Sequence, residues 1–89
     1  MKIVGLDIGS TTVKAVCVED GRTLWRDYRR HNTKQAECVL EFLERMTTEC
    51  GFEAGRDRIF ATGSGAGLIG PYIGAKLVQE VVAVAAALE

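Results

Sequence analysis

The chain has 89 residues, of which 47% are hydrophobic and 26% charged, and its formal net charge is −1. A chain of this length forms one small domain with a modest core, and its composition is that of a globular rather than a disordered protein. The near-zero net charge gives no general attraction to nucleic acid or to an anionic membrane surface, so neither is expected as a partner.

Three β-strands are expected in the first thirty residues. Residues 2–7 are mostly apolar, and residues 11–19 are rich in β-branched residues with a period of two. One face of this second strand consists of Val13, Ala15 and Cys17. Asp20-Gly21 indicates a tight hairpin turn. Residues 23–30 follow as a third strand with two mixed faces, so we predict an antiparallel meander with this strand in an exposed or edge position.

The side chains of the third strand are assigned no chemistry. Trp25 and Tyr28 are interpreted as packing residues. We interpret Arg26, Arg29 and Arg30 as a solvated strand face, with a surface that meets a partner as the alternative. His31 follows them and is interpreted as a solvated loop histidine.

An amphipathic helix is expected after the meander. Asn32, followed three positions later by Gln35, resembles a capping box, and Gly51 is a typical helix-ending glycine. Between them, apolar residues recur at a spacing of three and four positions, at Ala36, Val39, Leu40, Leu43, Met46 and Cys50. This stripe predicts the face of the helix that packs on the core.

The second half of the chain completes an α/β pattern. Residues 58–62 form a fourth strand, which must run parallel to its neighbour because a helix connects it to the third strand. A glycine cluster at 63–67 follows, then an irregular segment or short helix at 71–75, and a last helix at 76–88. The predicted fold is a mixed sheet carrying helices, in the order β-β-β-α-β-α.

The cysteines and the apolar runs indicate a cytoplasmic protein. Cys17, Cys38 and Cys50 show no metal-type spacing such as C-x-x-C, and an odd count without a secretory signal indicates reduced thiols that fill the core. The apolar run at 77–88 is too short to cross a bilayer and contains Glu80. No membrane association is predicted.

The loop between the first two strands reads Asp-Ile-Gly-Ser-Thr-Thr and has the chemistry of a phosphate site. Gly9 permits a positive φ angle and a close backbone approach, and successive amides in a tight turn form an anion-binding nest. Hydroxyl donors for phosphate oxygens are supplied by Ser10, Thr11 and Thr12. The alternative is a plain polar turn in which side-chain oxygens bond to local amides.

Two charged side chains adjoin this loop. Asp7, at the end of the first strand, is a candidate catalytic residue and a candidate Mg²⁺ ligand acting through water, because Mg²⁺ gives up its water reluctantly. Lys14 alternates to the same face as Thr12 and is a candidate point charge for a terminal phosphate.

The glycine cluster permits two interpretations. Its pattern, Gly65-x-Gly-x-x-Gly, matches a dinucleotide-binding fingerprint, but Gly70-Pro71 interrupts the required helix, and no further strand with an acidic residue follows. We favour a turn at the carboxyl end of the fourth strand, beside the first loop and close to the phosphates. The candidate binding residues are Gly63, Ser64 and Gly65. The alternative is a set of simple turn glycines.

Residues 3–16, IVGLDIGSTTVKAV, resemble the first phosphate loop of the actin, heat-shock chaperone and sugar-kinase superfamily. More narrowly, they resemble the activator ATPases of 2-hydroxyacyl-CoA dehydratases and the related benzoyl-CoA reductase subunits. Residues 61–70, ATGSGAGLIG, and 74–81, GAKLVQEV, are similar to the same family. The resemblance implies a ribonuclease-H-like, actin-like ATPase subdomain, with residues 1–89 forming the N-terminal piece of a longer chain.

The resemblance also implies a function. ATP and Mg²⁺ would bind between two such domains, and hydrolysis would drive electron transfer from a [4Fe–4S] cluster to a partner dehydratase or reductase. The cluster would belong to the longer protein, shared across a homodimer by cysteines beyond Glu89, and this piece alone would hydrolyse ATP poorly. Glu80 is implied as a catalytic contact to a Mg²⁺-bound or attacking water, with a helix-surface acid as the alternative.

Two other functions fit the sequence. A fragment of a sugar or acetate-type kinase would use the same phosphate loop, and only a part of the chain beyond this sequence would separate it from an activator. A small interaction module with no nucleotide site would use the loops only as turns.

Overall fold

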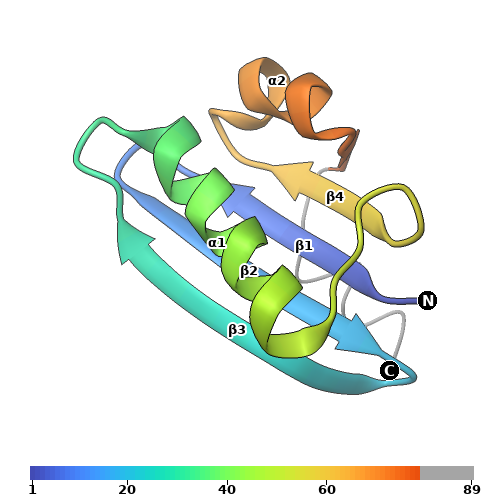
Figure 1. Cartoon of the computed structure of the whole chain (residues 1–89). Coiled ribbons are helices and arrows are strands. Elements are labelled where there is room, and N and C mark those ends of the chain that lie inside the picture. The colour runs from blue at the N-terminus through green and yellow to red at the C-terminus, as the bar shows by residue number, and fades with distance from the viewer. Residues whose placement is uncertain (79–89) are drawn as a thin grey trace.

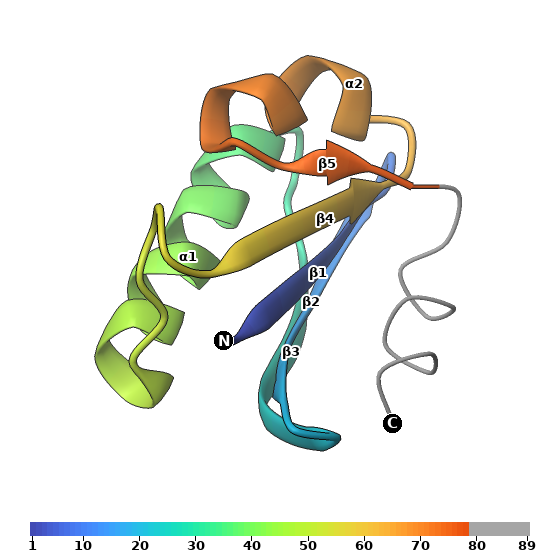
Figure 2. The same ribbon diagram turned by 90° about the vertical axis from the view of Figure 1, so that its right-hand side faces the viewer.

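The computed structural model describes residues 1–78, which form a five-stranded mixed sheet of order β3-β2-β1-β4-β5. Figure 1 shows β1 to β4 side by side in this order. β1 (Ile3–Ile8), β2 (Thr12–Glu19) and β3 (Arg22–Arg30) are the predicted antiparallel meander, and β3 lies at the edge as predicted. β4 (Arg58–Thr62) pairs with β1 in parallel, which confirms the predicted crossover. β5 (Lys76–Leu77) pairs in parallel with β4, as Figure 2 shows.

The segment at residues 76–78 differs from the predicted last helix. Residues 76 and 77 were expected to begin the last helix, but they form β5, because their backbone continues the sheet beside β4. The rest of that helix, including Glu80, lies outside the described residues. Before β5, the 3₁₀ turn η1 (Gly70–Ile73) overlaps the short helix expected at 71–75. The helix α2 (Ala66–Ile69), which begins inside the glycine cluster, was not predicted. No helix in residues 1–78 is long and apolar enough to cross a membrane.

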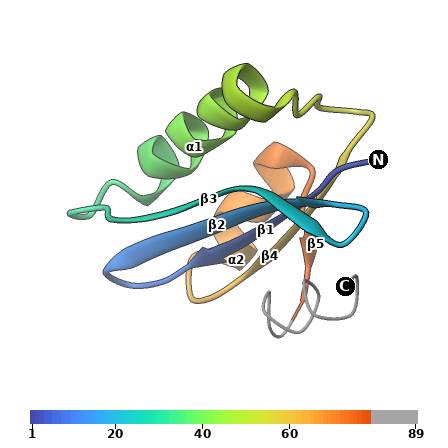
Figure 3. The same ribbon diagram turned by 90° about the horizontal axis from the view of Figure 1, so that it is seen from below.

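Helix α1 (Gln35–Cys50) covers one face of the sheet (Figure 3). Its buried residues are Cys38, Val39, Phe42 and Met46. The predicted stripe is therefore only partly right, because Ala36 and Leu40 are exposed. The helix is turned so that Phe42, fully buried, packs edge-on against Trp25 at a ring-centroid distance of 5.5 Å. A large aromatic pair gains more from burial than Leu40 does.

The core lies between α1 and the sheet. The predicted apolar face of β2, Val13, Ala15 and Cys17, is buried, as is Trp25. Tyr28 was expected to pack but is 73% exposed, because it alternates onto the other face of the edge strand. All three cysteines are free, and burial raises the pKa of the Cys17 thiol to about 12, which makes it unreactive at neutral pH.

A buried carboxylate joins the N-terminus to the loop before β4. Asp57 accepts hydrogen bonds from the backbone amides of Lys2 at 2.9 Å and Glu53 at 2.8 Å. It also accepts two from the Arg56 guanidinium, at 3.1 and 2.8 Å. Arg56 first, and then the two amides, hold the pKa of Asp57 well below its usual range. These hydrogen bonds fix the N-terminal end of β1. The predicted site lies at the other end of this strand.

Candidate functional site

Two loops that are far apart in sequence meet at one edge of the sheet. The loop between β1 and β2 (residues 9–11) and the glycine turn that follows β4 (residues 63–65) both lie at the carboxyl ends of parallel strands. The amide of Gly65 donates to the carbonyl of Ile8 at 2.9 Å. The glycine turn therefore lies beside the first loop, as the sequence predicted.

Two carbonyl groups of the first loop, those of Gly9 and Thr11, are held by other parts of the chain. The Gly9 amide donates to Thr12 O at 2.9 Å, and the His31 amide donates to Thr11 O at 3.1 Å. The Gly9 carbonyl accepts from His31 Nε2 at 3.0 Å and from the Gln35 side-chain amide at 2.6 Å. These bonds fix the path of the loop from both sides.

Unlike these carbonyl groups, the amides of Ser10 and Thr11 have no hydrogen-bond partner among residues 1–78. Both residues are exposed. The Thr11 and Thr12 hydroxyl oxygens lie 3.4 Å apart. Two neighbouring amides without acceptors, next to paired hydroxyls, form a donor group suited to an anion.

Gly9 contributes to this loop for a different reason than predicted. Its φ angle is not positive, and its amide is used inside the loop rather than offered to a ligand. A side chain at this position would instead place its Cβ 3.0 Å from the Thr12 carbonyl oxygen. The tight closure of the loop thus favours glycine at this position. The amides available to a ligand are those of the next two residues.

His31 was predicted to be a solvated residue, and this is wrong. It is 6% exposed, and its Nδ1 accepts a hydrogen bond from the Thr33 amide at 3.1 Å. The ring proton is therefore on Nε2, which donates to the Gly9 carbonyl. His31 directly follows β3, and β3 ends beside the first loop. The histidine ring therefore reaches the Gly9 carbonyl and supports the loop.

The predicted capping box is also wrong. Helix α1 begins at Gln35 with no side-chain cap, and Asn32 and Thr33 have φ angles of 50° and 68°, in the left-handed region. The Gln35 side chain reaches Gly9 instead of the helix N-terminus. Sequence reasoning missed His31 and Gln35 as supports of the loop. The one sequence signal for this role is their position: His31 directly follows the third strand and Gln35 begins the first helix, where the chain returns to the first loop.

Gly63 allows the second loop to approach the first. Its φ angle is 97°, and a Cβ at this position would lie 2.5 Å from the Ile8 carbonyl oxygen and 2.8 Å from Asp7 Oδ1. The Gly63 backbone is therefore in direct contact with the end of β1 and with the Asp7 carboxylate. Ser64, the next residue, is exposed.

Asp7 and Lys14 are cross-strand partners in the β1–β2 pair, so their side chains lie on the same face of the sheet. Asp7 is half-buried and Lys14 is exposed, and neither forms an ion pair within the described part of the chain. Residues 1–78 contain no group of three His, Cys, Asp or Glu residues that could hold a metal ion. One carboxylate nevertheless fits a Mg²⁺ bound with a nucleotide, which keeps several waters and takes phosphate oxygens as ligands.

Neither a protein-family model nor a curated protein sequence matches this chain. Among solved structures, it is similar to the activator of the 2-hydroxyisocaproyl-CoA dehydratase from Clostridium difficile, solved with bound ADPNP, at 26% identity and a TM-score of 0.65. It is also similar to a protein from Bacteroides thetaiotaomicron described as having an actin-like ATPase fold, at 17% identity and a TM-score of 0.67. The chain has the actin-like ATPase fold.

A third structure of this fold is the ROK hexokinase from Thermus thermophilus, at 22% identity and a TM-score of 0.62, where 90% of this chain and 33% of that one are covered. The match to the Bacteroides protein covers 96% of this chain and 36% of that one. The match to the Clostridium activator covers 89% of this chain but 29% of the activator. The chain thus spans 29 to 36% of the length of these three proteins.

Proposed function

We propose that this chain is the ATP-binding N-terminal subdomain of a cytoplasmic activase. The longer protein would couple ATP hydrolysis to electron transfer from an iron–sulfur cluster to a 2-hydroxyacyl-CoA dehydratase or benzoyl-CoA reductase, with a homodimer as its working form. The observation that carries the nucleotide site is the pair of Ser10 and Thr11 amides, which have no protein acceptor in residues 1–78. The Gly9 and Thr11 carbonyls of the same loop are bonded to the chain. The similarity to an activator solved with ADPNP supports this choice of ligand.

Each residue of the first loop has a distinct part in the proposed site. The Ser10 and Thr11 amides and the adjacent hydroxyls donate to phosphate oxygens, and Lys14 supplies a mobile positive charge. Asp7 holds a water of the metal ion, which neutralises phosphate charge when bound. Gly63, Ser64 and Gly65 bring a second backbone segment to the same phosphates. Glu80 is proposed to contact a Mg²⁺-bound or attacking water.

The iron–sulfur cluster is proposed only for the longer protein. Within residues 1–78, Cys17 and Cys38 are buried in the core, and no cysteine belongs to a group that could hold a metal. Nothing in the proposed nucleotide site depends on a cluster.

A kinase of the sugar or acetate type is the second candidate, favoured by the similarity to the Thermus hexokinase. An assay on the longer protein that would contain this subdomain distinguishes the activase from the kinase. ATP hydrolysis is measured with and without hexoses or acetate. The activase hydrolyses ATP without forming a phosphorylated product, and reduces its dehydratase or reductase partner only while ATP is consumed. Phosphorylated sugar or acetate formed at the expense of ATP contradicts the activase and establishes the kinase.

A further inference from the structure

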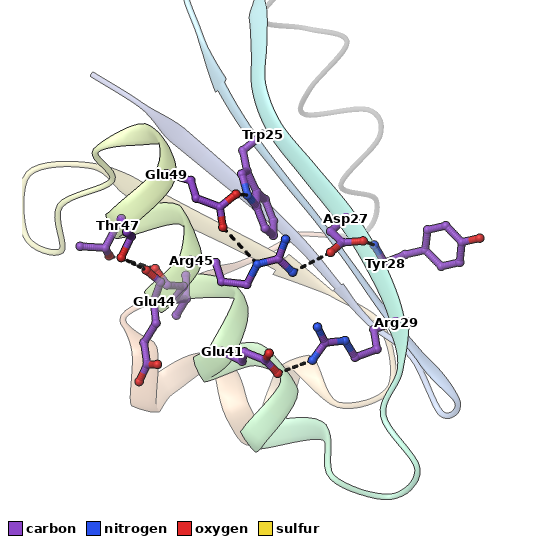
Figure 4. Close-up of polar contacts among 11 residues, drawn as sticks. Trp25, Asp27, Tyr28, Arg29, Glu41, Glu44, Arg45, Thr47 and Glu49 are labelled. Carbon is purple, nitrogen blue, oxygen red and sulfur yellow. Dashed lines mark hydrogen bonds and ion pairs between the residues drawn. The ribbon is translucent and has the colours of Figure 1, made fainter.

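The face of the sheet opposite α1 carries a row of side chains beside the first loop. The register pairs Lys14 with Asp7 on one side and with Tyr28 on the other. Thr12 pairs with Arg30. Residues opposite one another, and residues two apart along a strand, share a face, so all five lie on the same side. In Figure 4, Tyr28 points away from α1, which identifies this side as the one opposite the helix.

The arginines of the other face are neutralised by carboxylates. Figure 4 shows Arg29 bonded to Glu41, and Arg45 bonded to Asp27 and Glu49. Arg29 was interpreted from the sequence as part of a solvated face with Arg26 and Arg30, and this is only partly right. It alternates toward α1 and packs near the Phe42 ring, although 41% of its side chain remains exposed.

Arg30 and Lys14 have no such compensation. Both are exposed, and neither forms an ion pair with a carboxylate among the residues that the structure describes. Asp7 is the one acid of their row and is half-buried. The row therefore carries a net positive charge, because it contains one acid and two basic side chains.

The end of β3 is attached to the loop by its backbone. Arg30 pairs with Thr12, the first residue of β2, and the next amide, that of His31, donates to the Thr11 carbonyl at 3.1 Å. Cβ atoms of such a pair lie about 4.5–5.5 Å apart, and an arginine side chain extends well beyond that. An anion held by the Ser10 and Thr11 amides is thus within reach of the Arg30 guanidinium.

We propose that Arg30 is a further phosphate-binding residue, which acts with Lys14 on the terminal phosphate of a polyphosphate chain held by the first loop. This inference rests on the proposed nucleotide site. The planar guanidinium donates two parallel hydrogen bonds to phosphate oxygens, whereas Lys14 acts as a point charge. Arg30 therefore selects for ligands with a terminal phosphate, and contributes nothing to the binding of the adenine.

The test compares Arg30→Gln with Arg26→Gln as a matched control. Arg26 is exposed, lies on the same strand and the same face, pairs with Val16, and also lacks an ion pair in residues 1–78. The probes are inorganic triphosphate and ATP, each with Mg²⁺, and the readout is the chemical shift of the Ser10 and Thr11 amides. We expect Arg30→Gln to weaken binding of both probes about fivefold, and Arg26→Gln less than about twofold. Arg30→Lys should recover part of the loss.

Four outcomes would overturn the inference. Equal losses in the two glutamine variants would show a general charge effect rather than a contact. A loss with ATP but not with inorganic triphosphate would show that Arg30 contacts the nucleoside. If the wild-type amides respond to neither probe, the nucleotide site fails together with the role of Arg30, whereas a wild-type response that Arg30→Gln retains in full contradicts the role of Arg30 alone.

Discussion

Replacement of Gly63 by alanine is expected to lower the free energy of unfolding by about 3 kcal/mol and to separate the two loops of the site. The φ angle of 97° is unfavourable for a residue with a side chain, and the new Cβ would lie 2.5 Å from the Ile8 carbonyl oxygen. Because that contact is with backbone, relief requires movement of β1 or of the glycine turn, which adds overpacking strain to the conformational cost. Such a loss is a large fraction of the stability of a small domain.

The matched control for this substitution is Gly67→Ala. Gly67 lies in α2, and a Cβ there would have no heavy atom within 4 Å. Alanine is the better helix former, so the expected change is within about 0.5 kcal/mol and of the stabilising sign. Urea unfolding followed by the fluorescence of Trp25, the single tryptophan, measures both variants. A Gly63 variant as stable as the Gly67 variant would contradict the close contact between the loops.

Asp57→Asn is expected to destabilise the chain by a similar amount, about 3 kcal/mol at neutral pH. All the groups that face this buried carboxylate are donors: the amides of Lys2 and Glu53 and the guanidinium of Arg56. An asparagine would present its own NH₂ group to one of them and leave a donor unsatisfied. Asp27→Asn is the control, since the side chain is 35% exposed and its ion pair with Arg45 contributes at most about 1 kcal/mol.

The same carboxylate predicts a pH dependence. The pKa of Asp57 is lowered in the folded state, so its contribution to stability is complete above the unfolded pKa of about 3.9 and decreases as the pH falls further. Urea unfolding at a series of pH values should show wild-type stability falling below about pH 4 more steeply than that of Asp57→Asn. Parallel profiles for the two proteins would show that this carboxylate is not specifically stabilised in the fold.

The strands were predictable because their signals are local. The period of two in residues 11–19 and the Asp20-Gly21 turn determined the meander, and the crossover rule determined that β4 is parallel. The helix face was not predictable in the same way. Apolar residues occur around several sides of α1, and the choice of Phe42 over Leu40 depends on Trp25, which comes from another strand.

In the candidate site, too, some features were predictable from local sequence and others were not. The position of the first loop and its neighbour, the glycine turn, followed from two short motifs at the ends of strands. The supports of the loop did not, because His31 and Gln35 act through contacts to Gly9 across 22 and 26 positions. Local patterns gave these two residues ordinary roles, as a loop residue and a cap, and only the return of β3 to the first loop brings them to Gly9.

The central claim is that the Ser10 and Thr11 amides hold the phosphates of a nucleotide. The direct measurement is an NMR titration of the chain with Mg²⁺–ADPNP at millimolar concentrations, with Mg²⁺–AMP as the ligand that lacks the β- and γ-phosphates. The account predicts that these two amide resonances shift most and those of Gly63 and Gly65 less, and that AMP produces little change. Amides of residues 10 and 11 that do not move, or that move equally with AMP, would contradict it.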